Sequence, residues 1–144
     1  MRTYLVALDN SARASHVLAA AVELASSTGA KLVLFRAVGL PHDLPHDSYA
    51  LSPDEVVSRL RERADGDLRA FAQTVPSAIA CTTRLEVGAA WQTIASVARE
   101  IGADLIILGS HGFSGVDRLL GTTASRVVNH ADRSVMVVRS HSTP

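Results

Sequence analysis

The chain has 144 residues, and its 14 lysines and arginines balance 14 aspartates and glutamates, so the formal net charge is zero. A length near 150 residues with 47% hydrophobic and 19% charged residues is typical of one folded domain and excludes a disordered chain. The charged residues form no basic patch, which argues against nucleic-acid binding, and no apolar run approaches the ~20 residues of a membrane helix.

The first part of the chain alternates short apolar runs with a helical pattern. Residues 4–8 predict a buried strand that is followed by Asp9. Ser11 is placed to cap the next helix, and Gly29 is typical of its end. Residues 31–38 are almost continuously apolar and predict a second strand.

A loop over residues 39–52 leads into a long helix. Ser52 stands at its expected cap, Pro53 at the first helical position, and Glu55 three residues after the cap. This combination is a signature of a helix start. The helix is predicted to run to about Val75, because a proline follows that residue.

The third predicted strand, residues 80–86, is more polar than the others, which indicates an edge of the sheet. It contains Cys81, the single cysteine of the chain, which is predicted to be a small core residue. A chain with one cysteine forms no internal disulfide, and its short apolar amino end does not match a signal peptide. We therefore expect a cytoplasmic protein.

The last part of the chain continues the alternation of helices and strands. The predicted elements are a helix over 91–101, a strand over 103–108, a helix from Thr122 or Thr123 to about 131, and a strand over 134–138. Trp91 is predicted to be a core residue of the first of these. Such alternation predicts an α/β fold in which an open, doubly wound parallel sheet carries helices on both faces. We expect residues 1–144 to form a single domain.

Glycines gather between the fourth strand and the last helix. Four of the nine glycines fall within fifteen residues, at Gly109, Gly112, Gly115 and Gly121. Glycine lets backbone N–H groups approach an anion closely, and a helix N-terminus favours phosphate. Nearby hydroxyl groups add donors, at Ser110, Ser114, Thr122 and Thr123. The segment therefore predicts a site for a phosphate-bearing ligand, although it matches neither the dinucleotide fingerprint nor a Walker loop.

The stretch from Gly109 to Thr122, with the two stretches that follow it, Ala124 to Ala131 and Val135 to Arg139, resembles the carboxyl half of a universal stress protein domain. The amino end agrees, because residues 5–11 resemble the first strand of that family and its aspartate. The resemblance spans essentially the whole chain. It implies a five-stranded sheet in the order 3-2-1-4-5, which brings Asp9 beside the glycine loop.

Members of this family that bind ATP carry the pattern Gly-x2-Gly-x9-Gly-Ser/Thr. Gly109, Gly112, Gly121 and Thr122 match its defined positions. The resemblance also implies that Asp9 and Ala7 contact the adenosine end and that backbone near Ala37 and Val38 contacts adenine. The ATP-binding residues expected in full are Ala7, Asp9, Ala37, Val38, Gly109, Ser110, His111, Gly112, Ser114, Gly115, Gly121, Thr122 and Thr123. The nucleotide would bring Mg²⁺ or Mn²⁺, held mainly by phosphate oxygens and by no protein side chain.

The glycine loop departs from the pattern in its length. Eight residues, 113–120, separate Gly112 from Gly121 where the pattern has nine. Two interpretations therefore stay open: an ATP-binding stress-response regulatory protein, and a protein-interaction module of the same fold that binds no nucleotide. A small hydrolase using Ser114 is a more distant alternative, because no catalytic triad is evident.

The same loop lacks a phosphate-binding lysine and a residue to position water, so we expect at most a slow ATPase. The resemblance also implies a homodimer in which the fifth strand, between Val135 and Val138, pairs across a two-fold axis. His42 and His46 lie in a polar loop and are predicted to be solvated rather than to bind a metal.

Overall fold

The structure is a computed structural model that describes residues 1–39, 52–110 and 120–139. These residues form one parallel sheet in the order β3-β2-β1-β4-β5, which confirms the expected topology. The strands are β1 (Thr3–Ala7), β2 (Lys31–Val38), β3 (Cys81–Val87), β4 (Leu105–Gly109) and β5 (Ser134–Val138). The helices between them are α1 (Ala14–Thr28), α2 (Pro53–Thr74), α3 (Ala90–Glu100) and α4 (Thr122–His130).

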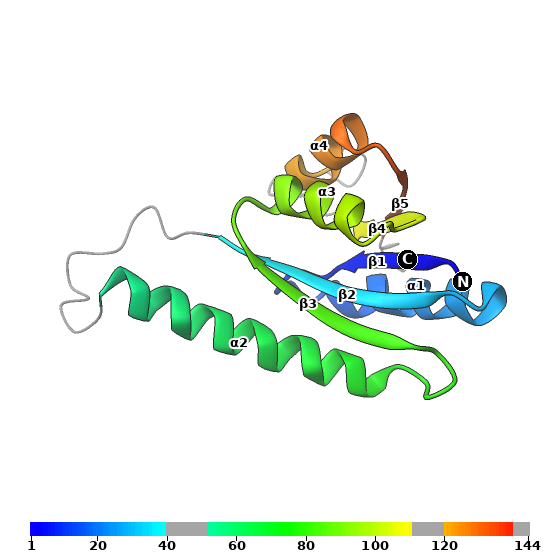
Figure 1. The fold of residues 1–144 in the computed structure, drawn as a ribbon, viewed down its shortest axis with the longest axis horizontal. Coiled ribbons are helices and arrows are strands. Elements are labelled where there is room, and N and C mark those ends of the chain that lie inside the picture. Colours follow the sequence, from blue (N-terminus) through cyan, green and yellow to red (C-terminus); the bar gives the residue numbers. More distant parts are fainter. Residues whose placement is uncertain (40–51, 111–119, 140–144) are drawn as a thin grey trace, which may run out of the picture.

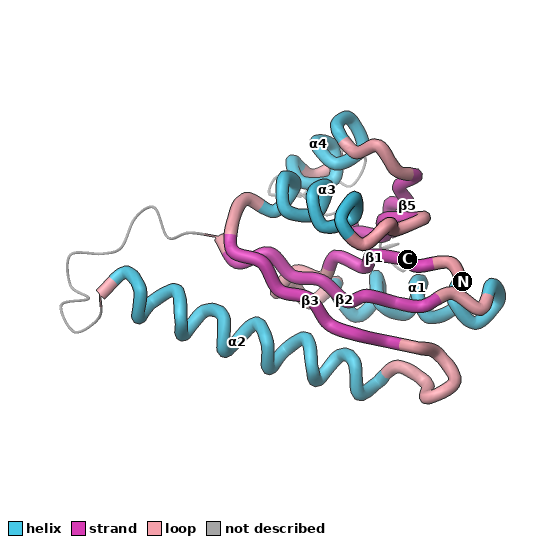
Figure 2. Tube along the Cα trace, in the orientation of Figure 1, coloured by secondary structure: helices cyan, strands magenta, loops and turns pink. Residues whose placement is uncertain are grey.

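The sheet lies between two layers of helices. Helices α1 and α2 cover one face, and α3 and α4 cover the other (Figure 1, Figure 2). Each face has its own buried cluster of hydrophobic side chains. The predicted α/β fold with helices on both faces is therefore confirmed.

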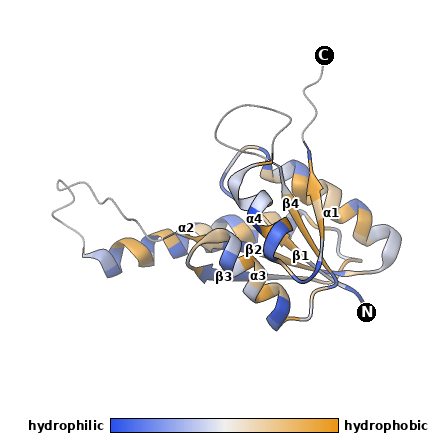
Figure 3. Ribbon diagram, turned by 90° about the horizontal axis from the view of Figure 1, so that it is seen from above, coloured by the Kyte–Doolittle hydropathy of each residue, from blue (hydrophilic) through white to orange (hydrophobic). Residues whose placement is uncertain are grey.

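Alternation along β2 shows how its sequence fills both clusters. Leu32 and Leu34 belong to the cluster under α1 and α2, whereas Val33 and Phe35 belong to the cluster under α3 and α4. Successive side chains of a strand point to opposite faces, so a strand buried on both sides needs a continuous apolar run. The central strands β1 and β4 are accordingly coloured as hydrophobic in Figure 3.

Two predicted helix ends are confirmed in atomic detail. The Ser52 hydroxyl accepts a hydrogen bond from the Glu55 backbone N–H at 3.2 Å, and Pro53 is the first helical residue of α2. Gly29 ends α1 in a left-handed conformation with φ of 74°, which a side chain would oppose. Local chemistry determines both of these helix ends.

The prediction that Ser11 caps the first helix is wrong. Helix α1 begins at Ala14 with Arg13 as its N-cap residue and has no side-chain cap. The Ser11 hydroxyl accepts from the Arg13 N–H at 3.3 Å, ahead of the helix, and donates to the Asp9 carboxylate at 2.6 Å. Both bonds lie in the turn between Asp9 and Arg13, so the hydroxyl closes this turn rather than the first turn of the helix.

The bounds of β2 and β5 are confirmed, and the other elements differ from prediction by one or two residues at their ends. Strand β3 is an edge strand, as its polar residues indicated. Cys81 is half-buried against the α1/α2 cluster, and this burial raises the pKa of its thiol. Among the described residues no helix combines the length and apolar character of a membrane span.

Candidate functional site

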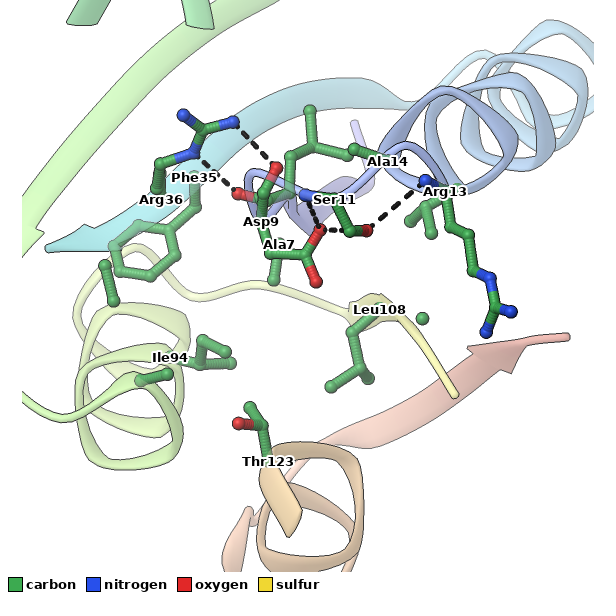
Figure 4. Close-up of a pocket in the computed structure, with 15 residues that line it drawn as sticks. Ala7, Asp9, Ser11, Arg13, Ala14, Phe35, Arg36, Ile94, Leu108 and Thr123 are labelled. Carbon is green, nitrogen blue, oxygen red and sulfur yellow. Dashed lines mark hydrogen bonds between the residues drawn. The ribbon is translucent and has the colours of Figure 1, made fainter. Parts of the chain in front are cut away.

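A pocket opens at the carboxyl ends of β1 and β4, the two strands between which the sheet order reverses (Figure 4). This is where ligands bind in open α/β sheets, because the chain leaves these two strands toward opposite faces. The described residues that line the pocket are Ala7, Leu8, Asp9, Ser11, Arg13, Ala14, Val17, Phe35, Arg36, Ala37, Ala90, Ile94, Leu108, Gly109 and Thr123.

The Asp9 carboxylate is held in place by the turn that follows β1. Its Oδ1 atom accepts from the Ser11 backbone N–H at 3.0 Å and from the Ser11 hydroxyl at 2.6 Å. Within the described ranges its Oδ2 atom has no hydrogen-bond partner. Figure 4 shows the carboxylate pointing toward the space bounded by Ile94, Leu108 and Thr123. The site therefore presents one free carboxylate oxygen to a ligand that donates hydrogen bonds.

Arg36 supports the same turn from β2. It is 8% exposed, and its guanidinium donates to the Leu8 carbonyl from Nε at 3.0 Å and to the Asp9 carbonyl at 2.7 Å. A third bond at 2.8 Å joins it to the Asp67 carboxylate of α2. Arg36 is not among the site residues expected from the sequence, although an arginine inside an apolar strand is itself a signal.

The two ends of the glycine loop are joined at its base. The Gly121 N–H donates to the Ser110 carbonyl at 3.0 Å, and the Ser110 N–H donates to the Val138 carbonyl at 3.0 Å. These bonds hold the start of α4 against the end of β4. Gly109 lies close to α1, because a Cβ atom at this position would stand 3.2 Å from Val17 Cγ2.

The N-terminus of α4 faces this pocket. Gly121 is its N-cap residue and supplies no side-chain cap, and Thr123 in the first turn lines the pocket. The first N–H groups of a helix lack partners within the helix and carry its positive dipole end. The pocket thus has a carboxylate acceptor on one side and helix amide donors on the other.

The structure places the predicted site residues in three groups. Ala7, Asp9, Ala37, Gly109 and Thr123 line the pocket. Ser110 and Gly121 join the ends of the loop, and Thr122 begins α4. His111, Gly112, Ser114 and Gly115 lie outside the described residues, as do His42 and His46.

Val38 stands apart from these groups. Its side chain is buried in the α1/α2 cluster, its carbonyl accepts from the Gly88 N–H at 2.9 Å, and it does not line the pocket. Pocket residues that sequence analysis missed include Ser11 and Arg13, which follow Asp9 closely in sequence.

Trp91 packs against the α3/α4 cluster, as predicted for a core residue. Its ring lies 4.9 Å from the His130 ring, and the Arg126 guanidinium lies 5.9 Å from its centroid. It is the only tryptophan of the chain and the neighbour of Ala90, which lines the pocket.

Comparison with known proteins identifies the family to which this architecture belongs. The model of the universal stress protein family matches residues 1–139. The chain belongs to the universal stress protein family. A universal stress protein of Synechocystis sp. is 27% identical over 147 residues, which cover 94% of this chain and 96% of the relative.

Solved structures show the same relationship. The universal stress protein UspA from Lactobacillus plantarum superposes with a TM-score of 0.81 at 28% identity, covering 96% of this chain and 97% of that one. A universal stress protein in complex with cAMP shares the fold at TM-score 0.65 and 24% identity, covering 97% of this chain and 98% of that one. The universal stress protein from Archaeoglobus fulgidus in complex with dAMP shares the fold at a TM-score of 0.61 and 21% identity. The match covers 96% of this chain and 98% of that one.

Proposed function

We propose that this universal stress protein is a regulatory protein that binds an adenine nucleotide, ATP above all, in the pocket between β1 and β4. One observation carries the proposal. The free Oδ2 atom of Asp9 and the N-terminus of α4 face the same pocket, so one ligand can donate hydroxyl groups to the first and place phosphates at the second.

The lining between these two groups suits a base. Ala7, Phe35, Ala37, Ile94 and Leu108 supply a mostly apolar surface, and apolar walls with a few polar groups are typical of small-molecule sites. The structures of two proteins with the same fold, one with cAMP and one with dAMP, add support for an adenine nucleotide.

The phosphates are assigned to the glycine loop and the start of α4. The described part of this site comprises Gly109, Ser110, Gly121, Thr122 and Thr123, and Arg13 adds a cation to the pocket lining. A divalent ion would enter with the nucleotide and bind mainly through its phosphate oxygens.

The proposal extends to assembly and location. We propose a homodimer formed through β5, because this strand forms the edge of the sheet among the described residues and contains the apolar residues Val135 to Val138. We also propose a cytoplasmic, non-enzymatic role for a single domain of residues 1–144, in which bound ATP acts as a regulatory ligand.

The direct test measures nucleotide in the purified protein. Mass analysis of the supernatant after heat denaturation is expected to find an adenine nucleotide, and added Mg-ATP is expected to raise the melting temperature. ATP at a hundred times its Kd stabilises a protein by about 2.7 kcal/mol. Gly121→Val is expected to remove the shift, whereas Gly66→Val on the exposed side of α2 is the control that keeps it.

Protein without released nucleotide and without a thermal shift would contradict nucleotide binding and favour the protein-interaction module. The feature that keeps this second function open is the number of residues between Gly112 and Gly121, which is one fewer than in the family pattern. Ester hydrolysis that is lost in Ser114→Ala would instead favour the hydrolase.

A further inference from the structure

Arg36 is the only charged or polar residue that is buried in the part of the chain that the structure describes. Removing a charge from water is unfavourable unless the group is fully paired and hydrogen-bonded. Hydrophobic packing therefore does not explain why a charged residue lies within the apolar strand β2.

The three hydrogen bonds of Arg36 extend the pairing of β1 with β2. The last backbone bond between these strands runs from the Leu8 N–H to the Phe35 carbonyl at 2.8 Å. Beyond it, the Arg36 side chain donates to the carbonyls of Leu8 and Asp9, at 3.0 Å and 2.7 Å. A planar guanidinium can hold two such carbonyls in fixed positions at once.

The backbone and the side chain of Asp9 are thus held from different sides. Arg36 holds the main chain from β2, and Ser11 holds carboxylate oxygen Oδ1 from the turn (Figure 4). Asp67 binds the remaining nitrogen of the guanidinium at 2.8 Å and so orients it from α2. No described residue forms a hydrogen bond with Oδ2. This oxygen of the carboxylate is therefore available to a ligand.

We propose that Arg36 is a positioning residue, which holds Asp9 so that its free carboxylate oxygen accepts hydrogen bonds from the ribose hydroxyls of the bound nucleotide. The chemistry matches, because hydroxyls donate and a carboxylate accepts. This inference rests on the proposed function. It adds that recognition of the ribose depends on Arg36. The donor atoms of this side chain bind protein oxygens and do not contact the ligand.

A second cavity shows which substitution tests this role. It lies between the Asp9 turn and α2, is lined by Phe71 and Thr74 among others, and shares Asp9, Ser11 and Arg36 with the first pocket. Because Arg36 lines both cavities, alanine at this position would enlarge them and change the pocket itself. Methionine keeps most of the volume and removes the three hydrogen bonds.

The experiment measures the affinity of the full chain for Mg-ATP and for its 2′,3′-dideoxy analogue. Arg36→Met is expected to weaken ATP binding about tenfold, as the loss of an oriented bond to a charged group does, and to change binding of the analogue less than twofold. Arg36→Lys keeps the charge without the planar donors and is expected to resemble Arg36→Met. In an Asp9→Ala background, Arg36→Met is expected to cause no further loss.

Equal losses for ATP and the dideoxy analogue would overturn the proposal, because Arg36 would then support the pocket as a whole. Additive effects of Arg36→Met and Asp9→Ala would overturn it as well. Asp67→Asn is the matched control, since it retains an acceptor for Arg36 and is expected to change ATP affinity less than threefold.

Hydrogen exchange in the ligand-free protein separates this proposal from the proposed function. Arg36→Met is expected to speed amide exchange in the turn after β1, residues 9–13, about tenfold without changing exchange in β4. If wild-type protein binds no ATP, the proposed function fails, while faster exchange would still establish that Arg36 holds Asp9. Unchanged exchange would overturn the positioning role whether or not ATP binds.

Discussion

Gly109→Ala is expected to create an unfavourable contact between the end of β4 and α1. The added Cβ atom would stand 3.2 Å from Val17 Cγ2, so one side must move by a few tenths of an ångström. Val17 is 5% exposed and cannot move freely into solvent. Adding a methyl group to a filled core costs about 1–3 kcal/mol, and this small overlap indicates the lower end.

A second effect of the substitution has the opposite sign. Replacing glycine by alanine stabilises a protein by about 0.4–1 kcal/mol where the backbone allows it, because the unfolded chain becomes less free. The net change is therefore a poor measure of the contact. A double-mutant cycle with Val17→Ala separates the two effects, because the entropic effect is the same in both backgrounds and cancels.

The assay is urea denaturation of wild type, Gly109→Ala, Val17→Ala and the double variant, with equal m-values as the criterion for comparison. The double variant is expected to be more stable than the sum of the single changes predicts, by about 1 kcal/mol. Gly66→Ala is the control, since a Cβ atom there meets nothing within 4 Å. Additivity of Gly109→Ala and Val17→Ala within about 0.3 kcal/mol would refute the close-approach argument.

Three further predictions address the turn, a helix cap and the thiol. Ser11→Ala removes two hydrogen bonds of the Asp9 turn. It is expected to lower nucleotide affinity several-fold in calorimetry and to cost about 1 kcal/mol or less of stability in urea denaturation. Unchanged affinity would contradict a role of Ser11 in holding Asp9. Ser52→Ala removes the cap of α2 and is expected to lower the free energy of unfolding by about 1 kcal/mol in urea denaturation, without changing nucleotide affinity. A loss of affinity would show that α2 is coupled to the pocket. Burial raises the pKa of Cys81, so at any pH below it the folded protein holds less thiolate than the unfolded chain. Alkylation of Cys81 is therefore expected to be slow at neutral pH and to accelerate as the pH rises through this higher pKa, and a rate that levels off near pH 8 would contradict the pKa direction.

The pocket was only partly predictable. Asp9 and Gly109 were found because strand ends can be located from apolar runs, and unusual residues at strand ends stand out. The sequence predicts Ser11 as a helix cap, but it does not show that the chain makes a further turn before α1 begins at Ala14. Arg36 was missed because its acceptors come from the end of β1 and from α2, which are distant in sequence.

The sequence by itself determined the order and kind of the elements, because the apolar period of 2 or 3.6 residues and the chemistry of caps such as Ser52 and Gly29 act within a few residues. It also located the ends of β2 and β5, where apolar runs stop abruptly. Only the tertiary structure decided which polar groups meet at the carboxyl edge of the sheet. Parallel strands join residues far apart in the chain, so the contacts of Asp9, Arg36 and Gly121 depend on how the sheet brings strand ends together, which no local pattern records.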